Sequence, residues 1–101
     1  MYLLKKHPLF DADLEEAACW YGARNPAVAM RLIDEAAVAV RVVLSDPLRF
    51  SIWEGEVRRV HLRRFPYLVF YEFRDNTIYL TAFAHGARDL VALLEERRVN
   101  P

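Results

Sequence analysis

Hydrophobic and polar residues follow two different periods along this chain. In residues 10–21 and 29–43, apolar residues recur every three or four positions, which is typical of helices that bury one face. In residues 57–64, 67–74 and 77–84, the apolar runs are shorter and rich in β-branched and aromatic residues, as in strands. The pattern predicts helices in the first half of the chain and strands in the second.

Proline, asparagine and glycine mark the ends of the first elements. Residues 2–6 form a short predicted strand, and Pro8 then opens the first helix, because a proline fits the first helical turn. This helix ends near Gly22. Asn25 as N-cap and Pro26 as first helical residue start the second helix.

The second predicted helix is apolar nearly all round, so we expect it to lie between the first helix and a sheet. Residues 48–55 are expected to be irregular, and Asp75-Asn76 predicts a tight hairpin. Residues 87–98 form the last helix. The order β-α-α-β-β-β-α predicts an α+β fold with an antiparallel sheet and an αα-hairpin packed on one face, leaving the other face bare. The length of 101 residues predicts a single domain, 1–101.

Composition narrows the class of protein. With 54% hydrophobic and 28% charged residues, the chain has the composition of a folded globular domain. The single cysteine, Cys19, excludes an internal disulfide and suits a reducing cytoplasm. The longest apolar run, 38–44, is too short to cross a membrane. The three histidines are scattered and no glycine-rich phosphate loop occurs, so we expect neither a metal nor another cofactor.

The net charge is zero, but positive charge is concentrated in one segment. Residues 57–71 contain four arginines, one histidine and no acid. Because strand side chains alternate between faces, Arg59, His61 and Arg63 are expected on the face opposite Val60 and Leu62. Such a basic row favours an anionic partner, either phosphate or an acidic protein segment. The alternatives are a solvated strand face, or arginines paired with acids of the helices.

Several segments in fixed order resemble ParE/RelE-like toxins of type II toxin–antitoxin (plasmid stabilisation) systems. They are Val57-Arg58-Arg59, LRRFPYLVFY from Leu62 to Tyr71, His85-Gly86-Ala87-Arg88-Asp89, residues 13–17 with Trp20-Tyr21, and Asp46-Pro47-Leu48-Arg49-Phe50. The resemblance covers essentially the whole chain.

This resemblance implies a cytoplasmic toxin that forms a hetero-oligomer with a cognate antitoxin, whose flexible C-terminal segment folds on binding. The group contains two target classes. RelE-type members cut mRNA on the ribosome, whereas ParE-type members inhibit DNA gyrase.

Departures from the RelE pattern favour the ParE-like function. RelE nucleases have an arginine where this chain has Leu68, and Lys5 and Lys6 are the only lysines. We therefore expect a binding toxin rather than an enzyme, acting on gyrase. Its contacts to target or antitoxin would be made by Arg59, His61, Arg63, Arg64 and Arg88.

A ribosome-dependent endoribonuclease is the alternative. In that case Arg59, Arg63, His85 and Arg88 would surround the scissile phosphate, with His85 as acid or base. His85 could instead cap the junction between the last strand and the last helix. A third hypothesis is an inactive relative that only binds its partner.

Overall fold

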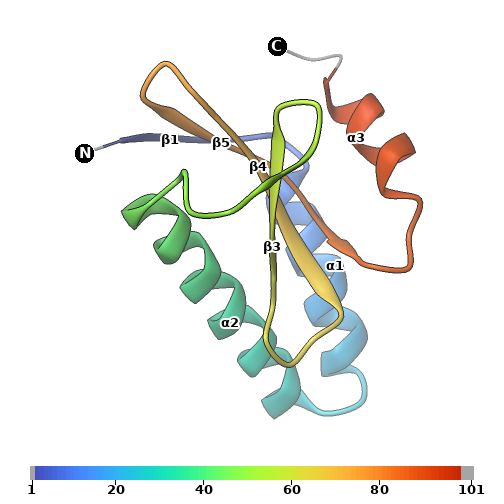
Figure 1. Cartoon of the computed structure of the whole chain (residues 1–101). Helices are drawn as coiled ribbons and strands as arrows, with labels where there is room; N and C mark the ends of the chain where they lie inside the picture. The colour runs from blue at the N-terminus through green and yellow to red at the C-terminus, as the bar shows by residue number, and fades with distance from the viewer. Residues whose placement is uncertain (1, 99–101) are drawn as a thin grey trace.

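The computed structural model describes residues 2–98, so residues 1 and 99–101 of the expected domain 1–101 lie outside the described part. The chain forms three helices and five strands (Figure 1). Their order is β1 (Leu3–Lys6), α1 (Phe10–Gly22), α2 (Pro26–Ser45), β2 (Ile52–Glu54), β3 (Val57–His61), β4 (Tyr67–Arg74), β5 (Thr77–His85) and α3 (Leu90–Arg98). The predicted α+β class is confirmed.

The five strands form one sheet in the order β1-β5-β4-β3-β2. Strands β2 to β5 form an antiparallel meander, whereas β1 pairs with β5 in parallel. The sheet is therefore mixed and not purely antiparallel as expected. The helical hairpin between β1 and the meander provides the long connection that lets β1 join the sheet edge in parallel.

Strand β2 lies in a segment for which the sequence predicted irregular structure. Gly55 adopts a φ of 58°, which an L-residue with a side chain rarely adopts. The resulting turn brings Ile52 back beside Arg58 of β3. At the other end of β3, regular pairing stops at His61, three residues before the predicted end of that strand.

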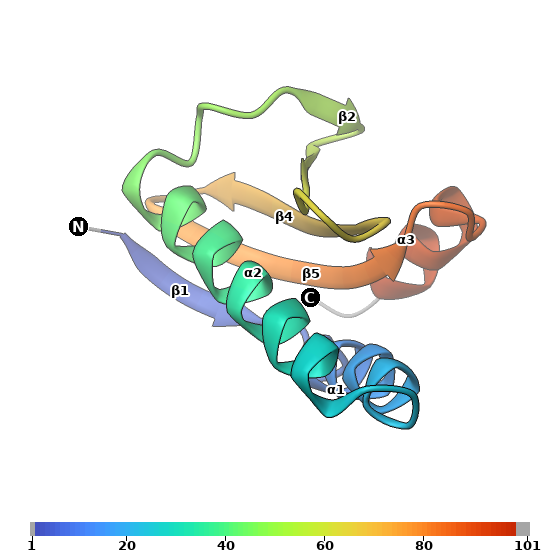
Figure 2. The ribbon, with the colours of Figure 1, turned by 90° about the horizontal axis from the view of Figure 1, so that it is seen from below.

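Helices cover both faces of the sheet (Figures 1 and 2). On the first face, a cluster that includes Leu32, Val43, Val69 and Phe83 joins α1 and α2 to the strands. The second face carries its own cluster, made of Val57, Leu68, Phe70, Ala82, Ala84, Leu90, Leu93 and Leu94. The expectation of one bare face was therefore wrong, because the leucines of α3 pack on it.

Helix α2 is buried along one stripe and open along another. Leu32, Ala36, Ala39 and Val43 are buried at spacings of three and four residues. Other apolar side chains of α2 are exposed, namely Met30, Ile33 and Val38. The expected contacts of α2 with α1 and with the sheet are present, but both lie along the buried stripe, so the helix is not buried all round. Among residues 2–98, no helix is long and apolar enough to span a bilayer.

Local capping explains where the helices begin. The Asn25 side chain accepts a hydrogen bond from Ala27 N at 3.0 Å, as predicted for the N-cap of α2. Helix α1 begins two residues after Pro8, because Leu9 N donates to His7 Nδ1 and forms a turn first. Helix α3 begins at Leu90 and not at residue 87 as predicted. The Asp89 side chain, just before it, accepts a hydrogen bond from Ala92 N through Oδ1.

The tight turn predicted between β4 and β5 is confirmed. Asp75 and Asn76 have φ values of 52° and 58°, the left-handed conformation of a two-residue hairpin loop. This turn fixes the register in which Arg74 lies opposite Thr77.

The Tyr71→Phe substitution tests the link between β4 and the segment after α2. The fully buried Tyr71 hydroxyl donates to the Pro47 carbonyl at 2.7 Å, and burial raises the pKa of Tyr71, so it keeps its proton. Phenylalanine would leave the carbonyl buried without this donor, which should lower the free energy of unfolding by about 1–3 kcal/mol in urea titrations.

Tyr79→Phe is the matched control for that measurement. Within residues 2–98 the Tyr79 hydroxyl has no hydrogen-bond partner, so its removal should change stability by less than about 0.5 kcal/mol. Equal unfolding midpoints for the two variants would contradict the role given to the Tyr71–Pro47 bond.

Candidate functional site

The alternation of β3 separates its arginines. Arg58 faces the α1–α2 side, where its Nη1 donates to the Phe50 carbonyl. Arg59 pairs across the sheet with Phe70 and points to the α3 side. Its guanidinium carbon lies 5.1 Å from the centre of the Trp53 ring, within cation–π range. Arg59 therefore lies against an aromatic ring, and none of the ion pairs among residues 2–98 involves it.

Arg63 and Arg64 lie in the turn that follows β3 and not on the strand itself. Their backbone N–H groups both donate to Glu35 Oε1 of α2, at 2.9 and 3.1 Å. One carboxylate thus holds the turn against α2, while both arginine side chains stay exposed. Neither guanidinium forms an ion pair within the described residues.

A groove of about 470 Å³ runs between α2 and β3, and we call it the α2–β3 groove. Its floor is apolar and its rim is mainly basic. It is lined by Arg31, Asp34, Glu35, Val38, Ala39, Val42, Arg49, Phe50, Val60, His61, Leu62, Arg63 and Arg64. Four arginines against two acids, Asp34 and Glu35, give the groove a net positive charge.

His85 and Arg88 lie at a different place, which we call the His85 hollow. This hollow, of about 670 Å³, is also lined by Glu16, Trp20 and Tyr67. His85 Nδ1 accepts a hydrogen bond from Ala87 N at 2.9 Å, so the imidazole closes the turn that leads to α3. This is the capping role that the sequence offered as the alternative to catalysis.

Tyr67 is the aromatic centre of the His85 hollow. Its ring lies edge-on to His85 with centroids 5.2 Å apart and stacks on Phe83 at 5.1 Å. Burial raises the pKa of Tyr67, and the neighbouring Tyr21 and Glu16 raise it further. The phenol therefore stays protonated at neutral pH, where it can donate a hydrogen bond but cannot act as a base.

The strands keep Arg59 and His85 apart. Arg59 lies on the α3 face, whereas His85 follows Ala84 of that face and so points to the α1 side, beside Tyr67. Arg63 belongs to the α2–β3 groove and Arg88 to the His85 hollow. The four residues considered for a nuclease are thus distributed over three places. Within residues 2–98, no group of three or more His, Cys, Asp or Glu could hold a metal ion.

Comparison with known protein families shows which family this chain belongs to. The model of the ParE toxin of the type II toxin–antitoxin system parDE matches residues 4–90. This chain belongs to the ParE toxin family. A solved structure described as the chromosomal ParDE TA system from P. aeruginosa has a similar fold, with a TM-score of 0.73 and 19% identity. The match covers 84% of this chain and 96% of that one. Among curated proteins, none matches the sequence.

Sequence reasoning missed part of the α2–β3 groove in this ParE-family chain. Arg31, Glu35, Val38 and Val42 follow one another at helical spacing and share one face of α2. That spacing was visible in the sequence, but the apolar members of the set were assigned to a buried interface. Arg49 comes to the same groove only because the segment after α2 folds back over β3.

Glu35→Ala tests how the basic turn of this ParE toxin is held. Removing the acceptor of two backbone bonds should speed hydrogen exchange at the Arg63 and Arg64 amides about tenfold. Glu35→Gln keeps an oxygen acceptor and should retain most of the protection. Asp34→Ala, an exposed neighbour on α2, should leave both amides unchanged. Unaltered exchange in Glu35→Ala would show that the turn does not depend on this contact.

Proposed function

We propose that this ParE-family toxin inhibits DNA gyrase by binding it, and that a cognate antitoxin neutralises the toxin by occupying the α2–β3 groove. The observation that carries the proposal is the composition of this groove, in which an apolar floor is bordered by four arginines. An acidic amphipathic segment matches that surface, because it buries apolar side chains on the floor while its carboxylates meet the rim.

The exposed guanidinium groups of Arg63 and Arg64 would pair with such carboxylates. Glu35 fixes the turn through its backbone bonds and leaves both side chains available to a partner. Fixing the turn before binding lowers the entropic cost of forming the complex. We propose that gyrase contacts the same two arginines, so that antitoxin and gyrase exclude each other.

The distribution of the other residues supports binding over mRNA cleavage. A ribonuclease must bring a proton donor, a proton acceptor and cations to one phosphate. Arg59 and His85 lie on opposite faces of the sheet, and the His85 Nδ1 atom is engaged in a turn. We therefore favour a non-catalytic toxin that acts in the cytoplasm as part of a toxin–antitoxin hetero-oligomer.

A gyrase supercoiling assay tests this function. The purified chain should inhibit supercoiling, and the antitoxin should restore it. Replacing Arg63 and Arg64 together by Gln should weaken inhibition about tenfold, because two exposed charge contacts contribute roughly 0.5–1 kcal/mol each. Arg41→Gln, an exposed arginine of α2 outside the groove, should inhibit like the wild type. Equal potency of all three proteins would contradict the role of the groove.

A parallel assay on translating ribosomes separates the two target classes. We expect no mRNA cleavage by the wild-type chain. Cleavage that is abolished by His85→Gln would identify a ribonuclease and overturn the gyrase proposal. A chain that neither cleaves mRNA nor inhibits gyrase would be a relative that only binds its antitoxin.

A further inference from the structure

The edge of β5 is left open where β1 ends. The backbone N–H of His7, directly after β1, donates to the Leu80 carbonyl at 2.8 Å, and the chain then turns into α1. Strand β5 continues to His85. In the pairing with β4, Tyr71 lies opposite Leu80 and Phe70 opposite Ala82, so Thr81 is the extra residue of a β-bulge. The backbone groups that follow Leu80 on this edge need partners other than a strand.

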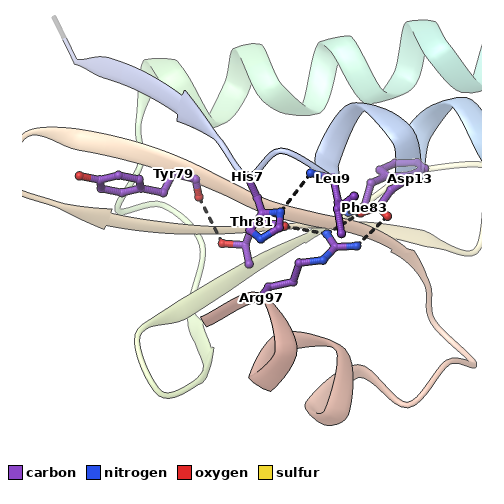
Figure 3. Close-up of polar contacts among 7 residues, drawn as sticks. All are labelled: His7, Leu9, Asp13, Tyr79, Thr81, Phe83 and Arg97. Atoms are coloured by element: carbon purple, nitrogen blue, oxygen red, sulfur yellow. Dashed lines mark hydrogen bonds and ion pairs between the residues drawn. The ribbon is translucent and has the colours of Figure 1, made fainter. Parts of the chain in front are cut away.

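Two charged side chains provide these partners (Figure 3). Phe83 N donates to Asp13 Oδ2 at 3.1 Å, and Arg97 Nη1 donates to the Thr81 carbonyl at 3.0 Å. Asp13 and Arg97 also bind each other through two bonds of 2.8 Å. Their side chains are only 11% and 5% exposed, so water competes little for the pair. An ion pair thus takes the place of the missing strand.

The same pair joins the two helical layers. Asp13 belongs to α1 on one face of the sheet, and Arg97 belongs to α3 on the other face. Helix α3 has nine residues, too few to be stable alone, and depends on tertiary contacts for its position. Its buried leucines supply the apolar part of those contacts. The Asp13–Arg97 pair supplies a directional polar contact near the C-terminal end of the helix.

His7 lies beside this pair in an environment that favours the neutral imidazole (Figure 3). Its Nδ1 accepts a hydrogen bond from Leu9 N at 3.0 Å, and its Nε2 is buried with no partner among residues 2–98. Burial lowers the pKa of His7 and the positive charge of Arg97 lowers it further, while Asp13 opposes the shift. The other charged or titratable groups of the adjoining hollow are Lys5, Lys6, Glu56, Glu72, Arg74 and Tyr79.

We propose that the Asp13–Arg97 pair is a latch that holds α3 on the sheet, and that protonation of His7 opens it. A proton on Nδ1 would replace the acceptor of Leu9 N by a donor, and it would place a second cation next to Arg97. The second cation favours a state in which α3, which carries Arg97, has left the sheet, and the lost acceptor favours a His7 ring that has turned towards water. Opening would uncover the apolar face around Phe70 and Ala82, next to Arg59.

The direction of the pH dependence follows from the lowered pKa of His7. Docked α3 favours the neutral ring, so this contribution is fully present above the ordinary pKa of 6.5 and is lost as the pH falls through the lowered value. Between these two pKa values, the equilibrium constant for release of α3 should rise by up to about tenfold for each unit by which the pH falls.

Hydrogen exchange of the α3 backbone amides between pH 7 and pH 5, corrected for intrinsic exchange rates, tests the latch. In the wild type, protection of α3 should fall with pH while the central amides of β4 and β5 stay protected. His7→Asn should abolish the pH response, because Asn can accept from the amide two residues on but does not titrate. His61→Asn, which removes an exposed histidine of β3, should keep the wild-type response.

Asp13→Asn tests the pair itself. It keeps an oxygen for Phe83 N but loses the charge, so α3 should lose protection at both pH values while the central strands keep theirs. If Asp13→Asn does not fold, Arg97→Gln breaks the pair from the helix side and carries the same expectation. Protection of α3 that does not vary with pH in the wild type, or that varies equally in His7→Asn, would overturn the proposal. The proposal would also be overturned if α3 kept wild-type protection in Asp13→Asn or Arg97→Gln. These readouts do not involve gyrase, so the latch and the proposed function can fail independently.

Discussion

Successive side chains of a β-strand point to opposite faces, and this constraint decides which functional groups can meet in this toxin. On β3, it sends Arg58 to the α1–α2 face and Arg59 to the α3 face. On β5, it sends Ala84 to the α3 face and His85 to the α1 side. Because helices pack on both faces, a group on one face cannot reach a phosphate held on the other. Arginines from α2, from the segment after it and from the turn after β3 still meet at one place, the rim of the α2–β3 groove.

Most helices and strands could be predicted from local rules, because the residues that start, cap or turn each element are neighbours in the sequence. The Asn25 cap and the Asp75-Asn76 turn are formed as expected. The place of α3 could not be predicted in this way. Its leucines fit the second face because small residues, Ala82 and Ala84, lie beneath them in the register of the finished sheet.

The candidate site was predictable in composition but not in arrangement. The cluster of arginines was visible, yet period-two alternation was extended to Arg63, which lies beyond the end of β3. The contact that decides the position of Arg63 is a carboxylate 28 residues earlier in the chain, Glu35. Such long-range partners, like the link between Asp13 and Arg97, depend on packing that no local pattern encodes.

The most direct test of this account is a methyl NMR titration of the chain with the C-terminal segment of its antitoxin. The account predicts that the signals of Val38, Val42, Val60 and Leu62 on the floor of the α2–β3 groove shift as the segment binds. The methyl signals of Ala84 and Ala87, beside His85, should remain in place. Shifts confined to the residues around the His85 hollow, with the groove unchanged, would contradict it.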